Sequence, residues 1–217
     1  TIHSQANIGN YDATRRYSGY FDPDKCYAYH YSATESERHF YPVGLASSFN
    51  CPTAGQWSGN YMNWAATQTI DPFRLALTGG YRVKDEPGET WLEKARHAPG
   101  YGLYPNRRLP ASGNNATLVA NVTAAQWDNL TVRIEGLGNK MRFSSSGNLD
   151  NTPTAYNPAI HLLTKGVAEQ SHWESCRKGQ QGCQNNGTPR NPRWERKVVD
   201  VAAVPSDAGT VYEVSVR

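Results

Sequence analysis

Residues 58–78 carry the strongest periodic pattern in the chain. Ser58 is a suitable helix N-cap, and Gly79-Gly80 is a strong stop signal. The pattern therefore predicts the main helix of the fold, with Trp64 and Phe73 in the core. Apolar side chains recur at intervals of three and four residues, which places them on one helix face: Met62, Ala66, Ile70, Phe73 and Leu77.

A proline interrupts this helix. Pro72 lacks the backbone N–H and disfavours helical angles at Asp71. Asp71 can instead cap a second helical segment whose first residue is Pro72. We therefore expect a helix that is kinked or broken at this point, with Arg74 more exposed than its apolar neighbours.

Four cysteines occur as two pairs that are local in the sequence, Cys26 with Cys51 and Cys176 with Cys183. Four cysteines allow three pairings, of which local pairing is the simplest. Neither pair has the C-x2-C spacing of a structural zinc site, so disulfides are favoured over metal binding or free thiols. We therefore expect two disulfides and a periplasmic or extracellular compartment.

The whole sequence predicts an α+β fold. Its 19 glycines and 13 prolines among 217 residues indicate many turns and loops. Residues 1–57 are rich in tyrosine and contain the first cysteine pair. Residues 58–96 are expected to be helical, including a short amphipathic piece from Glu89 to Arg96, and residues 116–217 to be mainly strands and loops. We expect a loop-rich single domain over residues 1–217, or a fragment of a larger domain, with antiparallel strands.

Several short runs have the alternation or the β-branched content of strands. Residues 124–128 suit one helical turn, residues 157–169 a second helix, and residues 179–192 a loop. The predicted strands are residues 27–31, 118–122, 130–134, 140–143, 197–204 and 211–216.

Tyrosine supplies much of the apolar mass, with 13 Tyr against 5 Phe. The alternation Tyr27, Tyr29, Tyr31 could present an aromatic surface for a glycan or protein ligand. The same rings could equally pack the loops around Cys26 and Cys51, and packing is the favoured interpretation. If the chain binds a ligand directly, these three residues are the best candidates.

The sequence offers no recognisable catalytic or cofactor motif. It has no G-x-S-x-G elbow, H-E-x-x-H helix, P-loop or Rossmann fingerprint. A net charge of +3 does not by itself indicate nucleic acid, and no apolar run is long enough to span a membrane. We therefore expect no enzyme activity, no catalytic residues, no metal ligands and no cofactor in this segment.

The run from Trp57 to Ala65, Trp-Ser-Gly-Asn-Tyr-Met-Asn-Trp-Ala, is the most distinctive in the chain. It continues through Ile70-Asp71 and Arg74 to Leu77-Thr-Gly-Gly-Tyr-Arg82. Together with Tyr20-Phe-Asp-Pro-Asp-Lys-Cys-Tyr27 and the ending Val211-Tyr-Glu-Val-Ser-Val-Arg217, it closely resembles type IV pilus tip-associated adhesins of the PilC/PilY type. The resemblance is strong over residues 20–95 and looser after them.

This resemblance implies a segment of the N-terminal, von Willebrand A-like region of such an adhesin, either part of that domain or inserted in it. It implies export through the periplasm to the pilus tip at the cell surface, and a role in surface attachment and pilus assembly. The implied partners are minor pilins or the pilus tip complex, and the implied ligand is a host or abiotic surface. The family's D-x-S-x-S metal motif and its calcium-carrying propeller are absent from the chain. No metal ligand is therefore transferred from the family.

Two other functions are compatible with the residues. One is a structural module that only docks the tip protein onto minor pilins. The other is a secreted, glycan-directed hydrolase or carbohydrate-binding module with aromatic stacking platforms, although no motif places the paired carboxylates that such a hydrolase needs. Because the chain starts without a leader and ends in an apolar alternation, we also expect it to be cut from a longer polypeptide.

Overall fold

The computed structural model describes residues 6–32, 34–95, 106–135, 140–145, 149, 169–175, 177–178, 183–201 and 212–217. Within these residues the fold is α+β, as predicted, with antiparallel sheets and three α-helices. The helices are α1 (Gly59–Ala66), α2 (Ile70–Thr78) and α3 (Ala116–Val122), and a short 3-10 helix spans Glu35–Glu37.

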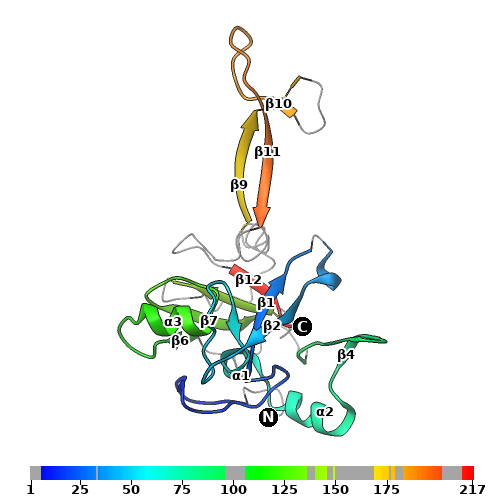
Figure 1. Ribbon diagram of the computed structural model, residues 1–217, viewed down its shortest axis with the longest axis vertical. Coiled ribbons are helices and arrows are strands. Elements are labelled where there is room, and N and C mark those ends of the chain that lie inside the picture. The colour runs from blue at the N-terminus through cyan, green and yellow to red at the C-terminus, as the bar shows by residue number, and fades with distance from the viewer. Residues whose placement is uncertain are drawn as a thin grey trace.

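The strands form three sheets and a separate hairpin (Figure 1). The first sheet has the order β2-β1-β3, with β2 (His39–Leu45), β1 (Lys25–His30) and β3 (Trp57–Ser58). The second has the order β12-β8-β7-β6, with β12 (Tyr212–Ser215), β8 (Lys140–Ser144), β7 (Leu130–Glu135) and β6 (Arg107–Leu109). The hairpin joins β4 (Arg82–Glu86) to β5 (Glu89–Leu92).

The third sheet extends away from the other two along the long axis of the molecule (Figure 1). Its order is β10-β11-β9, with β10 (Cys183–Asn185), β11 (Trp194–Val201) and β9 (Glu169–Ser175). Strand β10 lies within the predicted loop 179–192. The predicted helix 157–169 lies outside the described residues except for Glu169, which belongs to β9.

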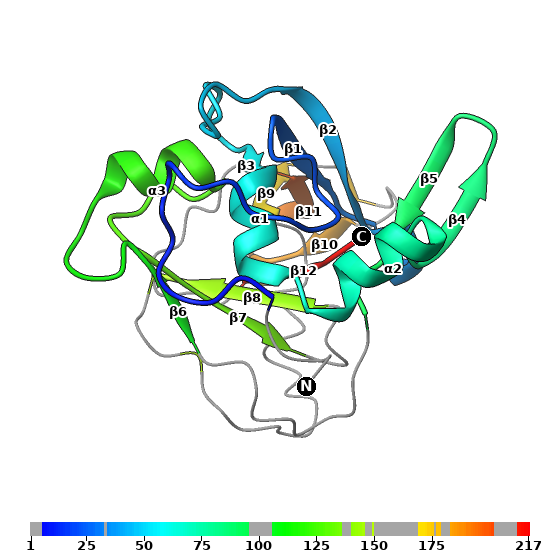
Figure 2. The same ribbon diagram turned by 90° about the horizontal axis from the view of Figure 1, so that it is seen from below.

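Helix α1 lies between the first two sheets (Figure 2). All eight of its residues are buried, and the Ser58 hydroxyl accepts the Tyr61 N–H at 3.4 Å as an N-cap. Trp57 and Phe143 join the two sheets beside it, with ring centroids 5.0 Å apart. The fold thus closes one aromatic core around this helix, and Trp64 is buried as predicted.

The predicted strand 118–122 is wrong, because these residues form helix α3. The Asn115 side chain accepts the Leu118 N–H at 3.0 Å and starts the helix. Val119 and Val122, three residues apart, are then both fully buried. The predicted helical turn at 124–128 is also absent, since that stretch contains bends and irregular backbone but no helix. The β-branched residues of 118–122 favoured a strand in the prediction. The N-cap at Asn115 and the three-residue spacing of the buried valines make the segment helical instead.

The amphipathic piece predicted from Glu89 is also wrong. Residues Glu89–Leu92 form strand β5, paired with β4 through the turn at Gly88. Gly88 has φ of 86°, a conformation that suits glycine in a tight hairpin. Turn geometry therefore dominates over the helical spacing in this stretch.

An N-terminal segment, residues 6–24, runs across α1 without regular secondary structure (Figure 2). Asn60 accepts the Tyr17 N–H at 2.7 Å and donates to the Arg15 carbonyl at 2.8 Å. Asn63 accepts the Phe21 N–H at 3.0 Å and donates to the carbonyls of Tyr17 and Phe21 at 3.0 and 2.8 Å. The two asparagines of the distinctive sequence run therefore replace a sheet partner for this segment.

Two glycines permit this close contact. A Cβ added to Gly59 would lie 2.0 Å from the Asp22 carbonyl oxygen, and one added to Gly19 would lie 2.2 Å from the Asn63 side-chain oxygen. Neither position has room for a larger residue. The run Ser58-Gly-Asn-Tyr-Met-Asn-Trp64 is thus explained by the packing of one helix under one segment.

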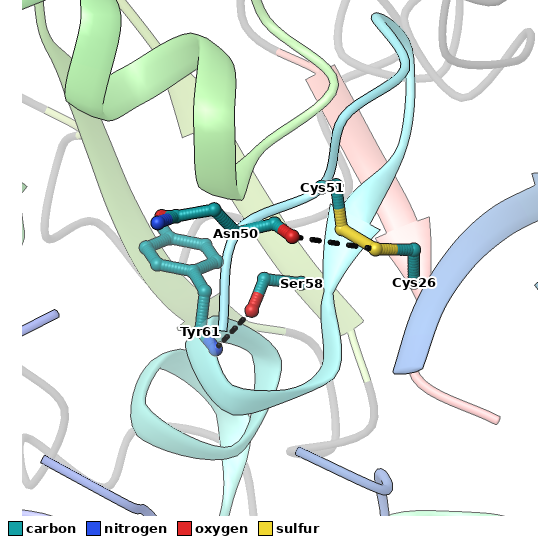
Figure 3. Close-up of a disulfide and its surroundings, with 5 residues drawn as sticks. All are labelled: Cys26, Asn50, Cys51, Ser58 and Tyr61. Atoms are coloured by element: carbon teal, nitrogen blue, oxygen red, sulfur yellow. Dashed lines mark hydrogen bonds between the residues drawn. A yellow bond between two sulfur atoms is a disulfide. The ribbon is translucent and has the colours of Figure 1, made fainter. Parts of the chain in front are cut away.

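The predicted disulfide Cys26–Cys51 is present, with Cα atoms 5.7 Å apart (Figure 3). It joins β1 to the segment that follows β2, and the Cys51 N–H donates to the Asn121 carbonyl of α3 at 2.7 Å. The first sheet and α3 are therefore fastened at one point. Cys176 lies outside the described residues, so its pairing with Cys183 stays a prediction.

We expect replacement of Cys26 and Cys51 together by alanine to lower the free energy of unfolding by roughly 3 kcal/mol, because the bond closes a loop of 25 residues. Urea denaturation of the variant and of the wild type under non-reducing conditions measures the difference. An unchanged midpoint would contradict this structural role.

We expect Asn63→Ala to lower the free energy of unfolding by roughly 3 kcal/mol, because it leaves buried backbone groups of Tyr17 and Phe21 without partners. Asn129→Ala is the matched control, since Asn129 makes a solvent-exposed side-chain hydrogen bond to Asn114. The control should change the same denaturation curve by less than about 0.5 kcal/mol. Equal losses in the two variants would argue against the role of Asn63.

Candidate interaction surface

Helix α2 is anchored by a buried carboxylate. Asp71 is 1% exposed, and its two oxygens accept the Gln68 N–H at 2.9 Å and the Ala95 N–H at 2.8 Å. Burial raises the pKa of Asp71, while the nearby positive charge of Lys94 and these two N–H donors oppose that rise. The Asp71 side chain thus ties the first turn of the helix to the segment that follows β5.

The predicted break lies earlier than expected. Helix α1 ends at Ala66 and α2 starts at Ile70, and the chain leaves helical geometry at Thr67, which is extended with φ of -72° and ψ of 132°. Pro72 lies within the first turn of α2, where no intrahelical partner for its missing N–H is needed. Asp71 is therefore inside the helix and receives the Gln68 N–H from the preceding turn.

The predicted burial of Phe73 is wrong. Phe73 is 57% exposed and Leu77 is 81% exposed, whereas Arg74 is intermediate. The apolar spacing was counted across 58–78 as one helix, but the two helices have independent directions. Only Asp71 is buried among the residues of α2.

The β4–β5 hairpin continues the exposed apolar surface. Gly79, in the left-handed conformation with φ of 77°, ends α2, and Arg74 lies over the Tyr81 ring at 5.6 Å. Tyr81 and Val83 are 42% and 40% exposed. We call α2 and the hairpin, residues 70–92, the arm. Its exposed apolar side chains, the arm surface, are Phe73, Leu75, Leu77, Tyr81 and Val83.

The charges of the arm are largely paired with one another. Lys84 lies 2.5 Å from a carboxylate oxygen of Glu89 and 3.6 Å from one of Glu86. The hydrogen bond to Glu89 raises the pKa of Lys84, and the same bond lowers the pKa of Glu89. Arg82 pairs with Asp85 at 2.7 Å, and its hydrogen bond lowers the pKa of Asp85. The two partners of each exposed pair offset each other's charge, so the arm carries little unpaired charge from these residues beside its apolar side chains.

The arm is joined to the first sheet by an aromatic contact. The Trp91 ring of β5 stacks on the His39 ring of β2, with centroids 3.9 Å apart and an angle of 23° between planes. Tyr20 and the arm also meet, since the Tyr81 N–H donates to the Tyr20 hydroxyl at 3.2 Å. Figures 1 and 2 show the arm at the edge of the molecule, near the C-terminal end of the chain.

The three tyrosines proposed as ligand contacts lie in different environments. Tyr27 is buried, and its hydroxyl accepts the Asp22 N–H at 2.8 Å. Tyr29 is half-buried against the core, and its hydroxyl accepts the Ser215 N–H at 3.0 Å. Tyr31 is half-buried with the Arg38 guanidinium 4.8 Å from its ring centroid. Tyr27 and Tyr29 thus serve packing, and ligand contact through this set stays a prediction.

Among the described residues, no group of three or more His, Cys, Asp or Glu side chains is arranged to hold a metal ion. No helix in the same part of the chain is long and apolar enough to cross a membrane. The arm surface was not among the sites predicted from the sequence. The signal is present in the apolar residues of 73–83, but the helical spacing places Phe73 and Leu77 on the face that was predicted to pack against the core.

Comparison with known proteins relates the chain to a family. Residues 8–102 match the family model described as PilY1 homolog, small alpha/beta domain. Over 185 residues the chain is 46% identical to a type IV pilus biogenesis factor PilY1 homolog of Xylella fastidiosa (strain Temecula1 / ATCC 700964), with 79% of this chain covered. No solved structure matches the chain.

The region around α1 and the arm is therefore a small α/β domain of the kind found in PilY1 homologs. The chain belongs to the PilY1-type pilus factors. It spans 15% of the length of the curated relative that it matches. The whole arm lies within the residues that match the domain, and the Cys26–Cys51 bond is consistent with an extracellular or periplasmic location.

We expect Phe73→Ala to lower the free energy of unfolding by less than about 1 kcal/mol, because the Phe73 side chain is already mostly in solvent. Trp64→Ala is the comparison, since Trp64 is 1% exposed and should cost roughly 3–5 kcal/mol. Urea denaturation of both variants measures the two values. A loss above about 2 kcal/mol for Phe73→Ala would mean that this side chain is part of the core.

Proposed function

We propose that the chain is a non-catalytic segment of a type IV pilus tip adhesin and biogenesis factor, and that its arm docks a protein of the pilus tip complex such as a minor pilin. Through that assembly the full-length protein supports attachment to a host or abiotic surface. The proposal includes the expected origin in, or insertion into, a von Willebrand A-like region. The pilus role rests on the similarity to the Xylella PilY1 homolog.

The observation that carries the docking role is the exposure of α2. A helix of nine residues is only marginally stable in water without tertiary packing. In most surface helices an apolar stripe faces the core, whereas Phe73 and Leu77 of α2 face solvent. A polar anchor at Asp71 holds the helix instead, which leaves the apolar side chains available to a partner.

The chemistry of the arm surface favours a protein over a glycan or a nucleic acid. Buried aromatic and aliphatic anchors dominate protein–protein contacts, and charged pairs surround them at the rim. The arm has this composition, with Phe73 and Leu77 exposed on α2 and the ion pairs of Arg82 and Lys84 on the hairpin that follows it. A net charge of +3 over the chain supplies little attraction for a polyanion.

We expect Phe73→Ser combined with Leu77→Ser, in the full-length protein produced in piliated cells, to lower the yield of sheared pili and surface attachment severalfold. The reason is loss of the two most exposed apolar side chains of the arm surface. Pilin in sheared fractions and adherent cells are counted, with the level of the variant protein checked by immunoblot.

Leu45→Ser is the matched control. Leu45 is 76% exposed, close to the 81% of Leu77, but it lies at the other end of β2 from His39 and the arm. A strand of seven residues is about 20 Å long, so the control leaves the arm surface intact. Normal pili and attachment in the double variant, at normal protein level, would refute docking through the arm.

A further inference from the structure

Two histidines nine positions apart in the sequence, His30 and His39, meet across β1 and β2. The strand register places His30 directly opposite His39, and their ring centroids are 4.9 Å apart. The intervening residues include the short 3-10 helix Glu35–Glu37, so sequence spacing alone does not reveal the pair. His30 is exposed and His39 is half-buried, which leaves the pair open to solvent.

The hydrogen bond of His39 fixes its tautomer. Its Nδ1 atom lies 2.7 Å from the Glu37 carbonyl oxygen, which can only accept, so Nδ1 carries the proton. In the neutral ring Nε2 then keeps its lone pair. A histidine whose second nitrogen donates to a carbonyl is the usual arrangement of a metal ligand. Burial lowers the pKa of His39, as do His30 and Lys84, while the Glu37 carbonyl and Glu89 oppose this.

The ring of His39 is held in place from the arm. Trp91 stacks on it at 3.9 Å, and the Trp91 Nε1–H donates to Glu89 at 2.7 Å. The Lys84 ammonium lies 4.6 Å from the Trp91 ring centroid and 2.5 Å from Glu89. The positive charge nearest this site is therefore offset by a carboxylate, and His39 is preorganised for binding.

We propose that His30 and His39 form a binding site for a divalent transition-metal ion, with Zn²⁺, Ni²⁺ and Cu²⁺ as the matching class. Two imidazoles bound to one tetrahedral ion at about 2.1 Å have ring centroids roughly 5 Å apart, close to the separation seen here. Imidazole nitrogen suits these ions, and Cu²⁺ should bind most tightly. Water or a side chain of a partner protein completes the coordination.

Such an ion would link the ends of β1 and β2 where Trp91 joins the arm to the first sheet. Binding would therefore stiffen the base of the arm. This role is independent of the docking proposal, because it depends on His30 and His39 and not on the arm surface. The two proposals can fail separately.

The test is titration of the oxidised 217-residue chain with ZnCl₂, NiCl₂ and CuCl₂ in separate calorimetric experiments at neutral pH. We expect one ion per chain at this site, and His30→Gln and His39→Gln should each weaken binding at least about tenfold, since loss of even an outer-shell partner costs 10–100-fold. His172→Gln, a histidine of β9, is the control and should leave the affinity unchanged.

A second readout uses Trp91. Bound Cu²⁺ quenches nearby tryptophan, so saturating Cu²⁺ should quench wild-type fluorescence and quench the Trp91→Phe variant less. Thermal melting of each variant without metal checks the fold, and the exposed position of His30 makes its substitution harmless. Wild-type affinity in both His30→Gln and His39→Gln, or an equal loss in His172→Gln, would overturn the proposal.

Discussion

The hydrogen bonds between the side-chain amides of Asn60 and Asn63 and the backbone of the N-terminal segment are the interaction on which the rest of the structure depends. They satisfy backbone groups of Arg15, Tyr17 and Phe21 that have no sheet or helix partner. With that segment fixed, α1 is covered on the side that the sheets leave open, and all its residues are buried. A chain with much loop can thus close a core around a helix of two turns.

Arg107 extends the same arrangement from the second sheet. Its guanidinium donates to the Asn7 and Gly9 carbonyls at 2.6 and 2.9 Å and to the Trp64 carbonyl near the end of α1. It also lies 3.7 Å from the Trp64 ring centroid. Burial lowers the pKa of Arg107 to about 10, so the group stays charged at neutral pH. One cation therefore joins β6, α1 and the N-terminal segment.

The sequence predicted those elements whose local pattern agrees with their tertiary position. Strands β1, β7 and β8 follow their alternation, and Ser58 caps α1 as expected. The predictions were wrong or missing where the tertiary arrangement, and not the local pattern, determines the position of a residue. The prediction that Phe73 is buried requires a single helix axis that continues across residues 67–69. The pairing of His30 with His39 depends on strand register, which no spacing rule in a single sequence provides.

The position of Asp71 explains how an apolar helix can remain exposed without being lost from the fold. Its carboxylate receives N–H groups from both sides of the arm's base, at Gln68 and Ala95, and the neighbouring Lys94 is 2% exposed. Burial lowers the pKa of Lys94 to about 7, and the charge of Asp71 opposes this, so the two groups favour each other's ionised forms. Removal of Asp71 would leave these N–H groups buried and unpaired, which makes the polar anchor costly to lose. The buried polar group of Asp71 holds α2 in place although Phe73 and Leu77 face water. This apolar surface therefore stays in a fixed position for a partner.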